Sequence, residues 1–252
     1  MTRSSGKNSS PPSRPKRSTR RVTRNVTPPI SSSAVFAGRK SNMAKGTLIL
    51  LRHGQTTYNE QQLMCGQHDA PLTKLGEDQA RVAGELLAAF TFDKIYSSSL
   101  SRAFNTAALA LHPAKPDIEK RDELREMDAG DFSGRSLTDP EIIAFPRDGS
   151  FALPGGESER QFVRRVRKFY ESEILPRMER GETVLIVSHA GTMHALGAIM
   201  NAEDTLKKSI WQGKRLPNTA IIEASYDGGK LTSQRLLTPP EPPKNPPLRP
   251  AI

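Results

Sequence analysis

The sequence predicts an α/β fold, a three-layer α/β/α sandwich built on a mostly parallel sheet. Three observations predict it. Short runs of aliphatic and β-branched residues alternate along the chain with longer stretches whose apolar residues recur at helical spacing. Two of the short runs, 47–51 and 183–187, are so apolar that we interpret them as buried strands. A histidine follows each of these two strands, His53 and His189 respectively.

The individual elements follow from caps, periodicity and turn residues. The strand at 47–51 comes first, and Thr73 is a typical N-cap for the helix after it. Ser158 is the expected cap of a second, long helix. The region 127–156 has weak periodicity and is rich in Gly, Pro, Asp and Phe, which predicts a loop or lid over the site. The other expected elements are a strand at 93–97, a helix at 101–111, a strand at 183–187, a helix at 192–200 and strands at 219–225 and 231–236.

Composition divides the chain of 252 residues into three parts. Residues 1–45 hold eleven of the 37 Lys and Arg residues and no acidic residue, which predicts a disordered basic extension. The remaining 26 basic residues face 27 acidic ones, so the expected folded domain, 46–237, is near neutral despite the formal net charge of +10. Residues 238–252 form a Pro-rich tail, for which we expect an extended polyproline-like conformation.

The basic extension allows three interpretations. It resembles an organellar transit peptide in composition, it could be a basic arm for nucleic acid or anionic surfaces, or it precedes a true start at Met43. We favour the start at Met43. No apolar run approaches the length of a membrane span, and the single cysteine, Cys65, excludes an intrachain disulfide. The expected compartment is therefore the cytoplasm, or an organelle if 1–42 is a transit peptide.

Residues suited to binding an anion cluster where the expected strands end. Ligands bind at the carboxyl ends of strands in open α/β sheets, so these residues should share one crevice. Arginine can hold two oxygens of a phosphoryl group, and a neutral imidazole is a nucleophile near neutral pH. Glu126 lies where a strand gives way to the expected lid and supplies a carboxyl group for general acid catalysis. The other members are Arg52, His53, Arg102 and His189, with the backbone N–H groups of Ala190 and Gly191.

Taken together, the motifs resemble those of the histidine phosphatase superfamily, which includes cofactor-dependent phosphoglycerate mutase. The resemblance covers about residues 46–236, and the ordered set is far more specific than one Arg-His-Gly tripeptide. The matching motifs are Arg52-His53-Gly54, Asp69-Ala70-Pro71-Leu72-Thr73, Tyr96-Ser97-Ser98-Ser99-Leu100-Ser101-Arg102-Ala103, Leu124-Arg125-Glu126, Gly130-Asp131-Phe132-Ser133-Gly134, Pro154-Gly155-Gly156-Glu157-Ser158 and Val187-Ser188-His189.

The resemblance implies phosphoryl transfer through a histidine. His53 is then the nucleophile, and Arg52, Arg102 and His189 hold the phosphoryl oxygens. Glu126 is expected to protonate the leaving oxygen and then to activate water.

Further family positions fall on Asn59, which corresponds to another phosphate contact, and on Cys65 and Gly66, where the family's mutases contact substrate. We expect no metal and no cofactor, because arginine and histidine supply the positive charge. The expected partner is a small phosphorylated metabolite, with no membrane and no nucleic acid; the oligomeric state, including a homodimer, is open.

Two departures from the family's mutases favour a phosphatase. The mutases carry a tyrosine three residues after the acid glutamate, and here that position is Ala129. The stretch between Glu126 and Glu157 also lacks the lysine and the arginine pair that the mutases carry there. Arg135 and Arg147 are candidates for binding a second anionic group, although loose loop charges account for them equally well.

A third alternative belongs to another class, namely a non-catalytic module that binds phosphorylated ligands and uses its basic arm on nucleic acid. The complete set of candidate catalytic residues argues against such an inactive site. The basic run 164–168 is interpreted as the solvated face of a helix.

Overall fold

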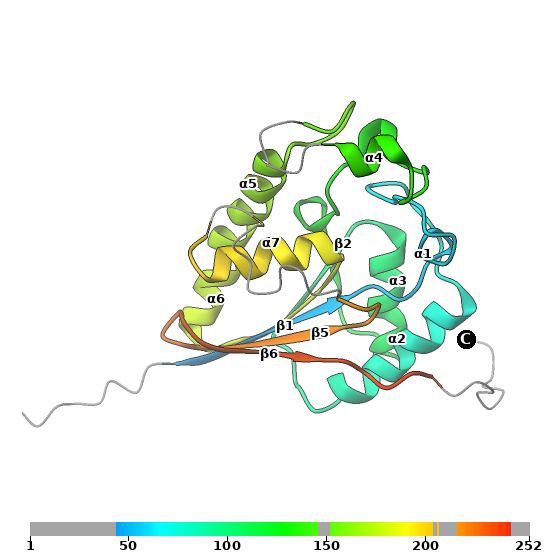
Figure 1. Ribbon diagram of the computed structural model, residues 1–252. Coiled ribbons are helices and arrows are strands. Elements are labelled where there is room, and N and C mark those ends of the chain that lie inside the picture. Colours follow the sequence, from blue (N-terminus) through cyan, green and yellow to red (C-terminus); the bar gives the residue numbers. More distant parts are fainter. Residues whose placement is uncertain (1–43, 146–151, 204–205, 207–215, 243–252) are drawn as a thin grey trace, which may run out of the picture. The chain divides into compact units, whose positions relative to one another are not determined.

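The computed structural model describes residues 44–145, 152–203, 206 and 216–242. All of them belong to one compact unit, 42–252. A six-stranded sheet lies in its middle, with helices packed on both faces (Figure 1). The predicted three-layer α/β/α fold is confirmed. The basic extension up to residue 43, Arg147 and the end of the Pro-rich tail from residue 243 lie outside the described residues.

The sheet has the strand order β3-β2-β4-β1-β5-β6. Neighbouring strands among the first four run parallel, whereas β5 and β6 are added as an antiparallel edge. The carboxyl ends of four strands therefore meet at one edge of the sheet, as the sequence predicts. The strands are β1 (Lys45–Arg52), β2 (Lys94–Ser98), β3 (Glu119–Arg121), β4 (Thr183–Ser188), β5 (Ile221–Asp227) and β6 (Lys230–Leu237).

The helices begin where the sequence places their caps. The hydroxyl of Thr73 accepts a hydrogen bond from the Gly76 N–H, and Ser158 forms a capping box with Gln161. A π-helical turn, Tyr170–Ile174, joins α5 to α6. The helices are α1 (Thr57–Glu60), α2 (Lys74–Leu87), α3 (Ser101–Ala110), α4 (Pro140–Ala144), α5 (Glu159–Phe169), α6 (Leu175–Arg180) and α7 (Ala190–Met200). None of the helices in the described part of the chain is long and apolar enough to cross a membrane.

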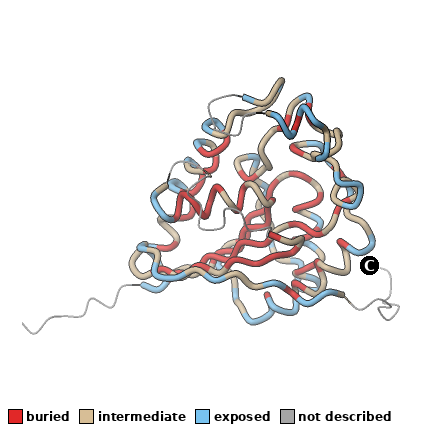
Figure 2. The backbone as a smooth tube through the Cα atoms, in the orientation of Figure 1, coloured by how far each residue is buried: buried red, intermediate tan, exposed pale blue. Residues whose placement is uncertain are grey.

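Successive side chains of the central strands point to opposite faces of the sheet, which produces one hydrophobic core on each face. In β1, Leu48 and Leu50 pack against α5, α6 and α7, while Ile49 and Leu51 pack against α2 and α3 on the opposite face. Figure 2 shows the central strands of the sheet as largely buried, in agreement with the burial of β1 and β4. Because both faces of β1 are buried, its position and register are firmly fixed.

Several short elements were not expected from the sequence. Strand β3 consists of Glu-Lys-Arg and has no apolar alternation, so only its pairing with β2 makes it a strand. The expected lid is more ordered than predicted, since it contains a 3₁₀ turn at Gly130–Phe132 and helix α4. A small third cluster of Ala129, Phe132 and Ile142 holds these turns together.

The register between β1 and β4 sets the positions of the two strand-end histidines. Arg52 lies opposite Ser188, and the His53 N–H donates a 2.9 Å hydrogen bond to the Ser188 carbonyl oxygen. A Cβ atom on Gly54 would lie 2.3 Å from the Gly76 carbonyl oxygen, so glycine is required where this loop passes helix α2. The backbone on both sides of His53 is therefore held by direct packing.

Candidate active site

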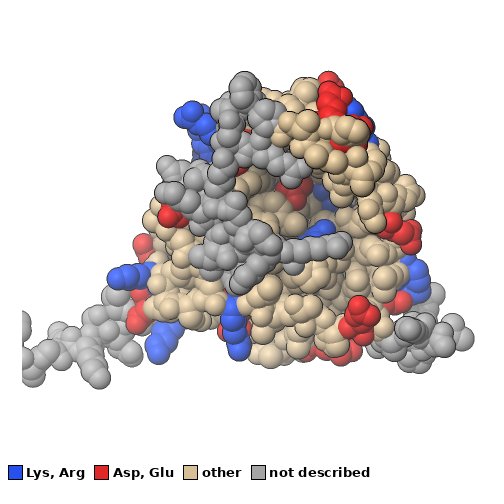
Figure 3. Space-filling view, in the orientation of Figure 1, with Lys and Arg blue, Asp and Glu red and all other residues tan. Residues whose placement is uncertain are grey.

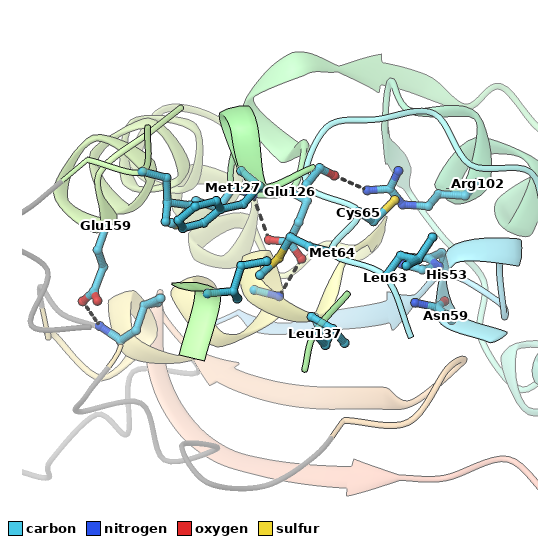
Figure 4. A pocket seen from close by; sticks show the side chains of 18 of the residues that line it. His53, Asn59, Leu63, Met64, Cys65, Arg102, Glu126, Met127, Leu137 and Glu159 are labelled. Carbon is cyan, nitrogen blue, oxygen red and sulfur yellow. Dashed lines mark hydrogen bonds between the residues drawn. The ribbon is translucent and has the colours of Figure 1, made fainter. Parts of the chain in front are cut away.

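A cavity of about 490 Å³ opens at the carboxyl ends of β1 and β4. Figure 3 shows a hollow on this face of the molecule with acidic and basic side chains at its bottom. The polar lining residues come from separate elements: Arg52 and His53 from the end of β1, Arg102 from α3, and Glu126 from the loop after β3. The structure thus brings these four predicted residues into one cavity (Figure 4).

His53 is held as a neutral imidazole with one defined tautomer. Its Nδ1 lies 2.7 Å from the Gly54 carbonyl oxygen, which only accepts, so Nδ1 carries the proton. Burial, followed by the charges of Arg52 and Arg102, lowers the pKa of His53 well below 6.5. The lone pair of Nε2 is consequently available for nucleophilic attack at neutral pH.

His189 lies next to His53 and is fully buried. The two imidazole rings are 5.2 Å apart between centroids. Arg102 Nε donates to His189 Nδ1 at 3.2 Å, so His189 Nε2 carries a proton and donates to the Ser98 hydroxyl at 2.8 Å. Burial and the charge of Arg102 lower the pKa of His189 well below 6.5. His189 does not contribute to the cavity lining, although the resemblance implies a phosphoryl contact for it.

Arg102 joins the site to the loop that follows α1. Only 1% of the residue is exposed, and its two terminal nitrogens donate to the carbonyl oxygens of Gly66 (2.7 Å) and His68 (2.6 Å). Together with the bond to His189, these contacts fix a positive charge at the bottom of the cavity. Arg52, the residue before His53, donates to the Leu216 carbonyl oxygen.

Glu126 occupies the N-terminus of helix α7. One carboxylate oxygen accepts from the Gly191 N–H at 2.9 Å and the other from the Met127 N–H at 2.8 Å. Ala190 and Gly191 both line the cavity, as predicted for substrate-binding residues. The Gly191 N–H, however, donates to Glu126 here, a contact that was not predicted from the sequence. The helix N-terminus therefore orients the candidate acid.

The predicted substrate-binding residues Asn59, Cys65 and Gly66 also line the cavity. Asn59 Oδ1 accepts from the Thr56 N–H and from Asn218 Nδ2, each at 3.1 Å, and no described residue accepts from Asn59 Nδ2. Burial raises the pKa of the Cys65 thiol, so this cysteine is not a competing nucleophile at neutral pH.

Sequence reasoning missed Arg165, which it assigned to a solvated helix face; that interpretation is wrong. Its guanidinium forms two hydrogen bonds with the Glu157 carboxylate, at 2.9 and 2.7 Å. It also donates to the carbonyl oxygens of Arg125 (3.1 Å) and Glu126 (3.3 Å). A signal was present, since Arg165 lies beside the buried positions Phe162 and Val166 of α5. Arg165 thus connects helix α5 to the loop that carries Glu126 through these hydrogen bonds.

Asn218 was also missed. Its Nδ2 donates to the His53 carbonyl oxygen at 3.1 Å as well as to Asn59. Because it lies in the turn before β5, far from the other motifs in sequence, only the fold reveals its place beside His53.

Neither candidate for a second anion contact is found in the described lining of the cavity. Arg135 forms ion pairs with Asp139 at 2.8 Å and Glu141 at 2.7 Å. Arg135 is therefore one of a set of loop charges that pair with each other. Arg147 lies outside the described residues. Within the described ranges, no group of His, Cys, Asp or Glu side chains is arranged to hold a metal ion.

The family model of the histidine phosphatase superfamily (branch 1) matches residues 48–238. The chain belongs to the histidine phosphatase superfamily. This match begins within β1 and ends just after β6, so the superfamily assignment includes all the described elements that line the cavity.

Relatives in the superfamily carry both mutase and phosphatase names. A protein of Parvibaculum lavamentivorans named 2,3-bisphosphoglycerate-dependent phosphoglycerate mutase is 37% identical over 202 residues, which cover 75% of this chain and 95% of the relative. The solved mycobacterial glucosyl-3-phosphoglycerate phosphatase has a TM-score of 0.62 at 29% identity, covering 76% of this chain and 97% of that chain. A putative α-ribazole-5′-phosphate phosphatase of Escherichia coli has a TM-score of 0.68 at 28% identity, covering 76% and 95%.

The two neutral histidines make folding stability depend on pH. Because burial and arginine charges depress the pKa values of His53 and His189 in the folded state, the unfolded chain binds more protons below pH 6.5. The contribution of the two histidines to the free energy of unfolding is thus fully present above pH 6.5, and it decreases as the pH falls below that value. Between pH 7.5 and 5.5 we expect a loss of up to about 1.4 kcal/mol per histidine, measured by urea denaturation.

The control for this measurement is His112→Gln, because His112 is an exposed residue that follows α3 and lies outside the site. Replacing His189 with glutamine should make the pH dependence of the free energy of unfolding shallower than in this control. An equally steep slope in His189→Gln would contradict a neutral, buried His189.

Proposed function

We propose that the protein is a phosphate monoester hydrolase that works through a phosphohistidine at His53. The observation that carries the proposal is the neutral His53 imidazole, which keeps its proton on Nδ1 and lies in the electrostatic field of Arg52 and Arg102. A carboxyl group, Glu126, lines the same cavity. Nucleophile, fixed positive charge and acid are the parts that phosphoryl transfer requires.

The first half-reaction forms the phosphoenzyme. His53 Nε2 attacks the phosphorus atom, the bond from phosphorus to the ester oxygen breaks, and protonated Glu126 gives its proton to the leaving oxygen. In the second half-reaction the Glu126 carboxylate takes a proton from water as the water oxygen attacks phosphorus. The bond from phosphorus to nitrogen breaks, and phosphate and neutral His53 are released.

The remaining polar groups stabilise the charge on the phosphoryl oxygens. Arg52 and Arg102 are the cations whose charges, after burial, lower the pKa of His53. We assign both of them to the phosphoryl oxygens. Asn59 Nδ2 is a further donor at the same end of the cavity. His189 acts through Arg102, which it orients by accepting the hydrogen bond from Nε.

Phosphoglycerate mutase is the second candidate, because curated relatives carry that name. A mutase must hold the carboxylate of its substrate as well as the phosphoryl group. Apart from Arg52 and Arg102, no described residue that lines the cavity is basic, and Arg135 is paired elsewhere. These observations favour hydrolysis. We further propose a small phosphorylated metabolite as substrate and the cytoplasm as compartment.

Hydrolysis and mutase activity can be separated in one experiment. We expect phosphate release from simple phosphate monoesters without any added bisphosphoglycerate, and loss of this release in His53→Ala. Phosphate release and phosphoglycerate isomerisation would be measured on the same preparation. Fast isomerisation that requires 2,3-bisphosphoglycerate, with negligible phosphate release, would contradict the hydrolase and support the mutase.

Arg165 generates a separate prediction as a positioning residue. In Arg165→Lys the two-pronged contact with Glu157 and the bonds to the Glu126 loop are lost, so the acid is misplaced. We expect kcat/KM to fall about tenfold for esters with poor leaving groups, which need the proton, and much less for activated aryl esters. The measurement is kcat/KM across a series of leaving-group pKa values.

Arg164→Lys is the matched control, because Arg164 is the exposed neighbour on the same helix. It should leave the leaving-group dependence unchanged. An equal loss for good and poor leaving groups in Arg165→Lys would mean that Arg165 supports folding only and does not position Glu126.

A further inference from the structure

We infer that the cavity beyond His53 selects monoesters whose alcohol part is apolar and carries no second anionic group. This inference rests on the proposed hydrolase function and names the substrate class of that same site. It follows from the composition of the cavity wall, from the charges that the wall presents, and from the exposed apolar residue at its rim.

The wall opposite the catalytic end is apolar. It is formed by segments far apart in sequence: the loop after α1 contributes Leu63 and Met64, and the lid contributes Phe132, Ile142 and Leu153. Phe132 and Phe145 meet edge to face with 5.4 Å between ring centroids. Figure 4 shows Leu63, Met64 and Leu137 around the space in front of His53. A cavity of about 490 Å³ is within the roughly 300–1,000 Å³ range of small-molecule sites.

The described residues in this part of the cavity offer no cation to a second anion. The described basic residues of the lining, Arg52 and Arg102, both belong to the phosphoryl end. The acidic ones are Glu126 and Glu159, and Glu159 lies across the cavity from His53 (Figure 4). A carboxylate or second phosphate on the alcohol part would therefore lose hydration without gaining a cation from the described wall.

Leu137 shows that the apolar lining continues to the surface. It is 47% exposed and still lines the cavity. Its backbone N–H donates to the Gln62 carbonyl oxygen at 2.9 Å, so the position is held by the main chain and not by its side chain. Ile143 on α4 is 62% exposed and is absent from the cavity lining. These two residues form a matched pair for substitution.

The test uses ethyl, butyl and hexyl phosphate, whose leaving alcohols have nearly equal pKa values. Any increase in kcat/KM along the series then reports contact with the alkyl chain and not leaving-group chemistry. We expect an increase of up to about fourfold per methylene group, the ratio that corresponds to about 0.8 kcal/mol. Hexyl phosphate with a terminal carboxylate should lose most of the gain.

The variant pair locates the effect in this cavity. In Leu137→Lys we expect a weaker increase from ethyl to hexyl phosphate and faster turnover of the carboxylated ester, because a cation now faces the chain. Ile143→Lys should show the wild-type pattern with every substrate. Both substitutions are at exposed positions, so folding is preserved and can be checked by thermal unfolding.

Failure of this inference is distinguishable from failure of the proposed function. Phosphate release at equal kcat/KM for ethyl, hexyl and carboxylated hexyl phosphate would overturn the apolar substrate class while the hydrolase stands. A Leu137→Lys pattern identical to that of Ile143→Lys would also overturn it. Absence of phosphate release from every monoester would instead contradict the hydrolase itself.

Discussion

The parallel pairing of β1 with β4 is the constraint on which the site depends. Arg52 lies opposite Ser188 in this pairing, so the residues that follow, His53 and His189, emerge side by side from the sheet. Both strands are buried on both faces, and a shift of one residue would turn every apolar side chain to the wrong face. The hydrophobic cores thus fix the distance between the two histidines.

Burial also determines the chemistry of these histidines. Two imidazoles and two arginines in one buried region would repel one another if the imidazoles were protonated. The structure resolves this by keeping both rings neutral, with the Gly54 carbonyl oxygen and the Arg102 Nε–H group defining which nitrogen carries the proton. The low pKa of His53 therefore arises first from its burial and then from the same positive charge that suits the cavity to a phosphoryl group.

Much of this arrangement was predictable from sequence, and the exceptions have physical reasons. Strand ends and helix caps depend on local patterns, so the strands that carry His53 and His189 and the caps at Thr73 and Ser158 were found. The Glu126 contact with the Gly191 N–H and the role of Arg165 depend on how distant segments meet, and no local pattern encodes that. Strand β3 and helix α4 are too short for a periodic signal and exist because their neighbours hold them.

The most direct test of the account is to locate the phosphoryl group on the enzyme. A reaction with a labelled monoester would be quenched in alkali, which preserves phosphohistidine, and the modified peptide identified by mass spectrometry. The account predicts label on His53 alone and none in His53→Ala. Label on another residue, or full turnover in His53→Ala, would contradict it.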